Sequence, residues 1–320
     1  MPKKDPGSFK ENLKIKRKKI VSDIKVKSRT VGKRLSTDNI FPLVCLAPSL
    51  LGVLIFFLVP FIVIIFYSVV DNPINKEFVF LDNYISIVKN SAFIRASGNT
   101  MLFSLTAVPL AVVLSLFLAM LLDYKLPLVS TFRTFFLSPL MVPIASVVLI
   151  WQVVFHLNGT LNQIIEHFGG SAVDWLKSDY GLYVVAILFL WKNLGYNMVL
   201  FLAAIQSIPK DLLEVATLEG AGAFYKFFFI KLRYLSPSIL FVGIMSLISS
   251  FKVFRETYLL TGDYPYSRLY LLQHFMNNTF RSLDYQKLSS AAILMGIVMV
   301  IIIGVLFFIE NRFGGELEDE

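Results

Sequence analysis

The sequence is poor in the residues that usually build metal, redox or hydrolytic sites. Its single cysteine, Cys45, lies in a hydrophobic run, which excludes a disulfide framework and a cluster of thiolate ligands. His156, His167 and His274 show no metal-ligand spacing, and each is expected to be an ordinary loop or surface residue. The nucleotide-binding pattern GxxxxGK(S/T) and the hydrolytic patterns HExxH and GxSxG are absent. Any energy source must therefore lie elsewhere, and we expect this chain to bind no cofactor and no metal.

Charge is also scarce, whereas apolar residues are abundant. Charged residues make up 16% of the 320 residues, against about 25% in soluble domains, and hydrophobic residues make up 56%. Mean hydropathy is +0.69. Six segments are long and apolar enough to cross a bilayer as helices, near residues 43–70, 100–122, 135–155, 182–205, 239–260 and 291–309. The predicted fold is an all-α integral membrane protein with six transmembrane helices.

The first 40 residues form a basic tail that is expected to stay cytoplasmic. Thirteen Lys and Arg residues precede Ile40, against four acidic residues. The tail lacks the apolar stretch of a secretory signal peptide, and the positive-inside rule retains such segments in the cytoplasm. It forms either an amphipathic helix on anionic headgroups or a solvated, disordered tail. Residues 41–320 are expected to form the six-span domain, which returns the C-terminus to the cytoplasm.

A polar segment separates the fourth and fifth spans, at residues 209–237. Pro209 suits the first turn of a helix, because its missing N–H is not needed there. Gly220 and Gly222 supply a backbone that can end this helix, and residues 224–232 can resume it. The segment is predicted to be a cytoplasmic helix-turn-helix at the membrane surface, where it can bind something in water.

Polar and ionisable residues interrupt the fourth and fifth spans. Ionisable side chains are costly in a membrane and indicate a cavity or pathway, although they also serve helix packing or neutralise one another. In the fifth span, Lys252 and Glu256 are spaced for an ion pair on one helix face. In the fourth, Trp191 and Tyr196 suit either stacking on sugar rings or packing in the bundle.

The polar segment between these spans carries a recognisable pattern. Glu214, Ala216, Gly220, Ile230 and Pro237 resemble the EAA motif of permease subunits of bacterial ATP-binding-cassette importers. That motif reads EAA, three residues, G, nine residues, I-x-L-P. Val215 and Arg233 depart from it, where Ala and Pro are usual.

The resemblance covers most of the chain after Ile40 and is to the sugar-importer branch, which includes maltose-type and glycerol-3-phosphate permeases. It includes the segments 81–84, 132–134, 191–209 and 250–262. It implies a bacterial plasma-membrane subunit that forms half of a translocation path and moves sugar by alternating access. The implied partners are a second homologous permease, two ATPase subunits carrying ATP and Mg, an extracytoplasmic solute-binding protein, the sugar and membrane lipid, without nucleic acid. The implied ATPase-coupling residues are Glu214, Ala216, Gly220, Ala221, Gly222, Ile230, Leu232 and Pro237.

The sugar path is expected on the fourth and fifth spans, with a neutral oligosaccharide as the default substrate. A secondary transporter or channel that is not coupled to ATP is the alternative function. A membrane enzyme would need a convergent acid/base or metal constellation, and none is visible. The resemblance to maltose-type permeases, together with the polar residues of these two spans, gives as path residues Trp191, Lys192, Asn193, Leu194, Gly195, Tyr196, Asn197, Ser249, Ser250, Lys252, Val253 and Glu256.

Overall fold

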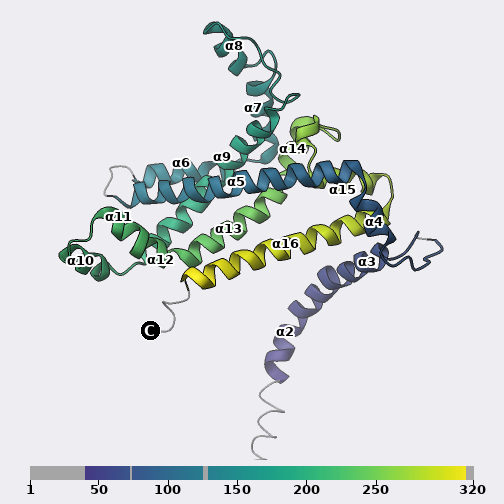
Figure 1. Cartoon of the computed structure of the whole chain (residues 1–320), viewed down its shortest axis with the longest axis horizontal. Coiled ribbons are helices and arrows are strands. Elements are labelled where there is room, and N and C mark those ends of the chain that lie inside the picture. The colour runs from purple at the N-terminus through teal and green to yellow at the C-terminus, as the bar shows by residue number, and fades with distance from the viewer. Residues whose placement is uncertain (1–39, 73, 125–128, 315–320) are drawn as a thin grey trace, which may run out of the picture. The chain divides into compact units, whose positions relative to one another are not determined.

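The computed structural model describes residues 40–72, 74–124 and 129–314, and helices form almost all of its regular structure (Figure 1). An isolated antiparallel bridge between Val70 and Phe78 is the one extended pairing in these ranges. The described chain divides into two compact units, with the boundary between Val63 and Ile64. Except for Ile40, the basic tail expected over residues 1–40 lies outside the described residues.

The first unit is built from apolar helix. α2 (Ile40–Val53) continues through a π-helical turn, Leu54–Leu58, into α3 (Val59–Ser68), which carries the chain into the second unit. Pro60 lies two residues after the π turn, and its nitrogen carries no hydrogen for the backbone bond that a regular helix would form there. The candidate span Cys45–Ser68 has a mean hydropathy of 3.0, which agrees with the first predicted span.

The second unit is a helical bundle. Figure 1 shows α5, α9, α13 and α16 side by side, with α10–α12 at one end and α14–α15 towards the other. Its elements are α4 (Asp82–Val88), α5 (Ser91–Asp123), α6 (Val129–Met141), α7 (Ile144–Phe155), α8 (Thr160–His167), α9 (Gly181–Gln206), α10 (Lys210–Leu218), α11 (Ala223–Tyr225), a π-helical segment Lys226–Lys231, α12 (Leu232–Tyr234), α13 (Ser236–Phe251), α14 (Phe254–Thr261), a short 3₁₀ helix Ser267–Leu269, α15 (Leu272–Arg281) and α16 (Tyr285–Gly314).

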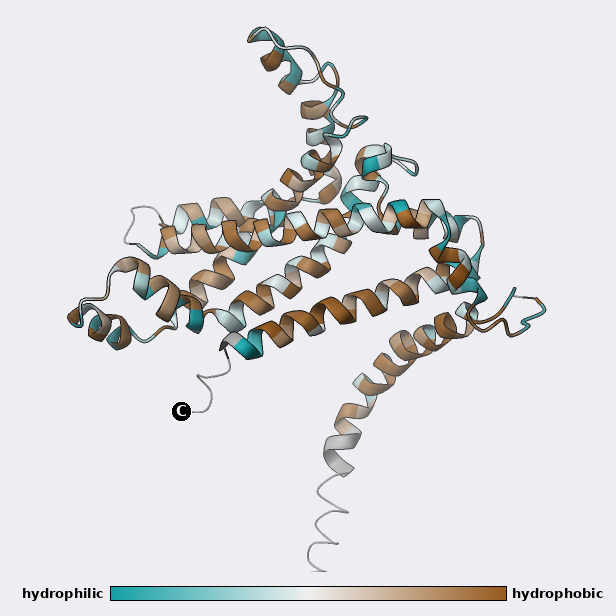
Figure 2. Ribbon diagram, in the orientation of Figure 1, coloured by the Kyte–Doolittle hydropathy of each residue, from teal (hydrophilic) through white to brown (hydrophobic). Residues whose placement is uncertain are grey.

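Six helical segments of the described chain are long and apolar enough to cross a membrane, which confirms the predicted fold class. The second and sixth spans, Ser91–Asp123 and Tyr285–Arg312, begin earlier than predicted, and the third and fifth differ in form. The third begins at Ile144 and not at residue 135, because the chain breaks after α6 at Pro143, whose backbone caps α7. The fifth, Ser236–Thr261, is divided between α13 and α14. Figure 2 shows hydrophobic residues along most of α16, the sixth span.

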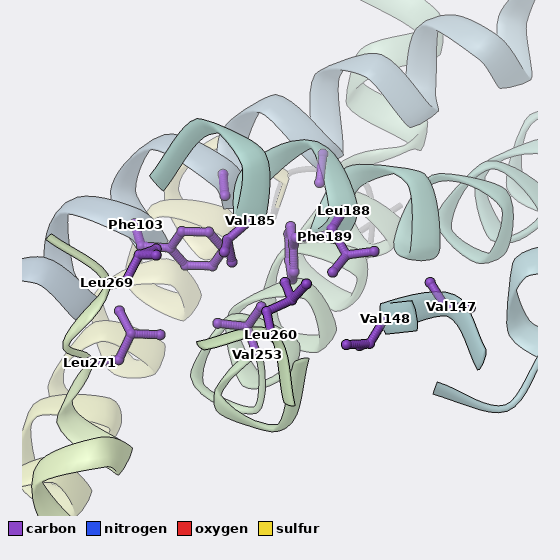
Figure 3. Packing of buried hydrophobic residues seen from close by; sticks show 12 residues of the cluster. Phe103, Val147, Val148, Val185, Leu188, Phe189, Val253, Leu260, Leu269 and Leu271 are labelled. Atoms are coloured by element: carbon purple, nitrogen blue, oxygen red, sulfur yellow. The ribbon is translucent and has the colours of Figure 1, made fainter. Parts of the chain in front are cut away.

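The core of the second unit is organised around α9. Buried residues recur along this helix at intervals of three and four, including Val185, Leu188, Met198 and Ile205, as expected for one packed face. Near the start of α9, Leu188 belongs to a cluster that draws on α5, α7 and α14 (Figure 3). Nearer the C-terminal end of α9, Met198 belongs to a second cluster with α5 and α13. This packing fixes which flank of α9 is left for polar side chains.

Candidate functional site

A cavity of about 1030 Å³ lies between α9 and the α13–α14 junction, with α6 and α15 at its edges. It carries both charged and apolar side chains, and two of its four charged residues, Lys252 and Arg255, are exposed, so the cavity is open to its surroundings. Its lining residues are Leu140, Leu188, Phe189, Lys192, Asn193, Tyr196, Ser249, Lys252, Val253, Phe254, Arg255, Glu256, Tyr258, Leu259 and Gln273.

An ion pair joins the two sides of this cavity. Lys192 Nζ on α9 lies 2.5 Å from Glu256 Oε1 on α14. Glu256 is buried, with 5% of its surface exposed, whereas the Lys192 side chain is 35% exposed. A buried carboxylate is costly unless it is paired, so the contact fixes α14 against α9.

The predicted pairing of Glu256 with Lys252 is wrong. The prediction assumed that both residues lie on one continuous helix, four residues apart. The helix is interrupted between them, because α13 ends at Phe251 and α14 starts at Phe254. The Lys252 N–H donates to the carbonyl of Ser249 at 3.1 Å, which closes the end of α13. The break turns the following residues, and Glu256 reaches α9 instead.

Seven of the twelve predicted path residues line the cavity. These are Lys192, Asn193, Tyr196, Ser249, Lys252, Val253 and Glu256. The other five lie outside the lining: Trp191, Leu194, Gly195, Asn197 and Ser250.

The polar members of that second group pack against neighbouring helices. Asn197 donates from Nδ2 to Ser246 Oγ at 2.9 Å, and both residues are buried between α9 and α13. Ser250 shares a hydrogen bond of 2.8 Å with Ser104 of α5. The polarity that predicted a pathway at these positions serves helix packing.

The remaining members also have packing roles or face outwards. A Cβ atom on Gly195 would lie 1.9 Å from the carbonyl oxygen of Phe136, so only glycine allows α6 to approach α9 so closely. Trp191 is 40% exposed, and its ring lies 6.4 Å from that of Trp151. Leu194 is half-buried.

The cavity also contains residues that the predicted path omits. Arg255 and Tyr258 come from α14, and Gln273 comes from α15. Arg255 is one of the ionisable residues of the fifth span, so sequence polarity could have identified it. Nothing in the sequence brings Gln273 to this position, because it lies in the connection before the sixth span.

His274 is buried, and its predicted loop or surface position is wrong. Its ring packs edge-on against Phe254 at 4.7 Å between centroids, and its Nδ1 accepts a hydrogen bond from the Leu271 N–H at 3.3 Å. Burial lowers the pKa of His274 to about 4, and the negative charge of Asp263 offsets this only in part. The neutral ring therefore anchors α15 to the start of α14. His156 and His167 are exposed, as predicted.

The predicted helix-turn-helix forms the connection between α9 and α13. Pro209 immediately precedes α10, one residue earlier than the predicted first-turn position. α10 ends at a glycine turn in which Gly220 has a φ of +84°. The Ala221 N–H donates to the Ala216 carbonyl at 2.8 Å, and the Gly220 N–H donates to that of Thr217 at 3.1 Å. This pair of bonds is a Schellman motif, which confirms the predicted turn.

The second half of this connection runs into α13 with little interruption. α11, the π-helical segment and α12 follow one another, and the Leu235 N–H donates to the Lys231 carbonyl at 2.9 Å. Pro237 then lies in the first turn of α13. Arg233 stands where the family pattern has proline, and a helix can pass through this position because its N–H is retained.

Side-chain contacts join the helix-turn-helix internally and to the bundle. Lys226 Nζ donates to Thr217 Oγ1 at 3.1 Å, which links its two halves. Lys231 Nζ lies 3.5 Å from Asp123 Oδ2 at the end of α5. The structure thus ties the connection to α5 as well as to the two helices that it joins.

An exposed apolar surface covers the helix-turn-helix. Leu218 is 88% exposed and Phe224 is 74% exposed, and Glu214 is also exposed, whereas Ala216 is buried. Large apolar residues exposed in one short segment are typical of an interaction surface. The further members of this surface are Val215, Tyr225, Phe228 and Phe229.

The sequence of this chain matches the profile of a known protein family. The profile of the family described as "Binding-protein-dependent transport system inner membrane component" matches residues 111–313, which include both the cavity and the helix-turn-helix. The chain belongs to this family. It is therefore a multi-pass subunit of a binding-protein-dependent importer and not an enzyme, and the resemblance in the sequence is confirmed. Family membership also decides against the secondary transporter or channel.

Individual relatives match over nearly the whole chain. The arabinooligosaccharides transport system permease protein AraP of Bacillus subtilis is 29% identical, over 87% of this chain and 90% of its own length. The sn-glycerol-3-phosphate transport system permease protein UgpA of Pectobacterium atrosepticum is 31% identical, over 89% and 97%.

A solved structure shares the fold. It is a chain in the crystal structure of a bacterial alginate ABC transporter in complex with an alginate pentasaccharide-bound periplasmic protein. The TM-score is 0.73 with 22% identity, covering 87% of this chain and 98% of that one.

Proposed function

We propose that this chain forms half of the membrane path of an ATP-driven sugar importer. An extracytoplasmic binding protein delivers the sugar, for which an oligosaccharide is the best-supported class. The support comes from the family and from relatives whose names include arabinooligosaccharides and sn-glycerol-3-phosphate. The cavity between α9 and α14 provides charged and hydrogen-bonding side chains on both sides, which suits a hydroxyl-rich substrate.

The observation that carries this proposal is that the same two helices hold both the cavity and the exposed connection. α9 ends at Gln206 and α10 begins at Lys210, while α12 leads directly into α13. A displacement of α10–α12 must therefore move α9 or α13, and with them the walls of the cavity. This linkage converts binding at one end of the bundle into a change of access in its middle.

The partner at the helix-turn-helix is a separate ATPase subunit. The exposed apolar surface with Glu214 beside it supports a docking role, and closure of two such ATPases around ATP and Mg would supply the energy. A second, homologous permease completes the path on the open side of the cavity. In this arrangement α10–α12 and both termini lie in the cytoplasm of a bacterial cell.

Purification of the tagged full-length chain from its native membranes tests the ATPase partner. We expect an ATPase subunit and a second permease to co-purify with the wild type. Glu214→Lys should lose the ATPase or uncouple its activity from uptake, whereas Glu166→Lys is the matched control, because it makes the same charge change on exposed α8. A chain that purifies without any ATPase, or a Glu214→Lys variant with full ATP-dependent uptake, would contradict this coupling role.

Uptake measurements test the sugar and the energy source. Cells that lack the chain should lose import of one class among a panel of radiolabelled neutral and acidic oligosaccharides. Depletion of ATP should abolish that uptake, whereas a protonophore should have little immediate effect. An uptake that follows the proton gradient would contradict the ATP-driven import proposed here.

A further inference from the structure

The charged residues of the cavity are not balanced. Lys192, Lys252 and Arg255 bring three cations, and Glu256 brings the one carboxylate among the lining residues. In the sequence, Lys192 and Lys252 are both cations within a membrane span, and nothing shows which of them is available to a substrate. The contacts in the structure show which cation is paired with a carboxylate and which is not.

Glu256 forms its ion pair with Lys192. The 2.5 Å contact between them spans the cavity from α14 to α9, and the carboxylate is buried. Removing a buried carboxylate from its cation is expensive, so the pair persists as a unit with no net charge. Lys192 therefore contributes little positive charge to a ligand.

Lys252 and Arg255 are in a different situation. Both are exposed, and neither forms an ion pair with a carboxylate of the described residues. Both line the cavity, and they lie on either side of the turn between α13 and α14, where the Arg255 N–H donates to the Lys252 carbonyl at 3.4 Å. Two uncompensated cations thus share one wall of a cavity that is otherwise apolar or neutral.

We propose that Lys252 and Arg255 form a subsite for the negatively charged group of an acidic saccharide, a carboxylate or a phosphate. This inference rests on the proposed function and specifies its substrate class. Arginine presents a planar fork of N–H donors that matches either group, and a recessed site of one sign concentrates ligands of the opposite sign. Asn193, Ser249 and Gln273 supply the neutral hydrogen-bonding groups that sugar hydroxyls need.

The first test measures the charge of the cavity directly in native membranes. A cysteine is introduced by Ser249→Cys in the full chain, with the exposed Cys45 replaced by serine. The thiol is labelled with an anionic methanethiosulfonate ethylsulfonate or a cationic ethyltrimethylammonium reagent, and the ratio of rates is compared with that of free cysteine. We expect the ratio to favour the anionic reagent by about tenfold, from two unit charges acting over several ångströms.

Neutralising the two cations should remove this preference. The double variant Lys252→Gln with Arg255→Gln should return the ratio of labelling rates to that of free cysteine. The control is Lys89→Gln with Arg95→Gln, which neutralises two exposed cations outside the cavity and should leave the ratio unchanged. A ratio equal to that of free cysteine in the unsubstituted cavity would overturn the subsite, since the two charges would then be neutralised in the assembled transporter.

The second test uses three saccharides of the same length to protect the Ser249→Cys thiol. Trigalacturonate carries carboxylates, maltotriose 6-phosphate carries a phosphate, and maltotriose is neutral. We expect at least one acidic probe to slow labelling several-fold at concentrations where maltotriose has no effect, and the choice between the two acidic probes identifies the charged group. The glutamine double variant should lose this protection.

The outcomes separate the subsite from the proposed function. Protection by maltotriose that is equal in the parent and the glutamine double variant would overturn the subsite and leave the sugar path in place. A ratio that shows excess positive charge, combined with no protection by any of the three saccharides, would count against a saccharide and therefore against the proposed function.

Discussion

The hydroxyl oxygens of Ser104 and Ser250 lie 2.8 Å apart, and both residues are buried between α5 and α13. Ser250 also donates to the Leu247 carbonyl at 2.7 Å within its own helix. The contact joins the second and fifth spans through small polar side chains, which allow close helix approach in a membrane. Ser250 is therefore a packing residue at the back of the cavity wall.

This position predicts that Ser250 responds to size. Ser250→Ala should lower stability by about 0.6 kcal/mol, the average for such interhelical bonds, and leave transport nearly unchanged. Ser250→Trp should prevent α5 and α13 from packing and reduce the amount of assembled protein. Apparent melting temperatures and yields in detergent measure both effects, with Ser249→Trp at the cavity surface as the control. Normal assembly of Ser250→Trp with blocked transport would instead place this side chain on the path.

The Lys192–Glu256 pair predicts an asymmetric cost of losing either partner. Lys192→Met strands a buried carboxylate and should cost about 3–5 kcal/mol, whereas Glu256→Gln leaves a partly exposed lysine and should cost less. The double variant should recover part of the loss, because no uncompensated charge remains. Thermal unfolding of the three variants gives the coupling energy. Additive losses would show that the two residues do not interact.

The turn at Gly220 predicts a difference between two neighbouring glycines. Gly220→Ala should be strained by about 1–2 kcal/mol, because an L-residue is disfavoured at a φ of +84°. Gly222→Ala is the matched control, since its φ of −68° suits any residue and no atom lies within 4 Å of the added Cβ. Coupled ATP hydrolysis and limited proteolysis of α10–α12 should change only for Gly220→Ala. Equal behaviour of both variants would contradict a specific role for the turn.

Burial of His274 predicts that stability depends on pH on the acidic side. Its pKa is lowered from 6.5 to about 4, so the unfolded chain binds this proton between those values while the folded chain does not. Stability should be complete above about pH 6.5 and fall by up to about 3 kcal/mol as pH decreases towards 4. His274→Gln should flatten melting temperature against pH in this range, whereas exposed His156→Gln should not. A slope unchanged by His274→Gln would assign it to other groups.

The sequence was sufficient for the features that depend on local chemistry. Apolar length predicted the spans, and Gly220 predicted the turn because glycine adopts a positive φ more readily than any other residue. The partner of Glu256 could not be predicted, because it depends on a helix break at Lys252 that leaves no strong signal and on which face of α9 is nearby.

The same limitation explains the other residues that the sequence misplaced. A polar residue in a membrane span looks the same in the sequence whether its side chain faces a cavity or packs against a neighbouring helix. Asn197 and Ser250 face helices, as their bonds to Ser246 and Ser104 show. His274 was assigned to a loop or surface because its connection is polar overall, and only the packing of α15 against α14 buries it.

The division of the fifth span also has a mechanical meaning. An unbroken helix of this length would move as one rigid body between the helix-turn-helix and the cavity. Here α13 is one rod that begins at the helix-turn-helix, and α14 is a second, shorter rod that Glu256 pins to Lys192. Under the coupling proposed above, the joint at Lys252 and Val253 would let α13 tilt while α14 keeps its contact with α9, and the wall bearing Lys252 would be the part that bends.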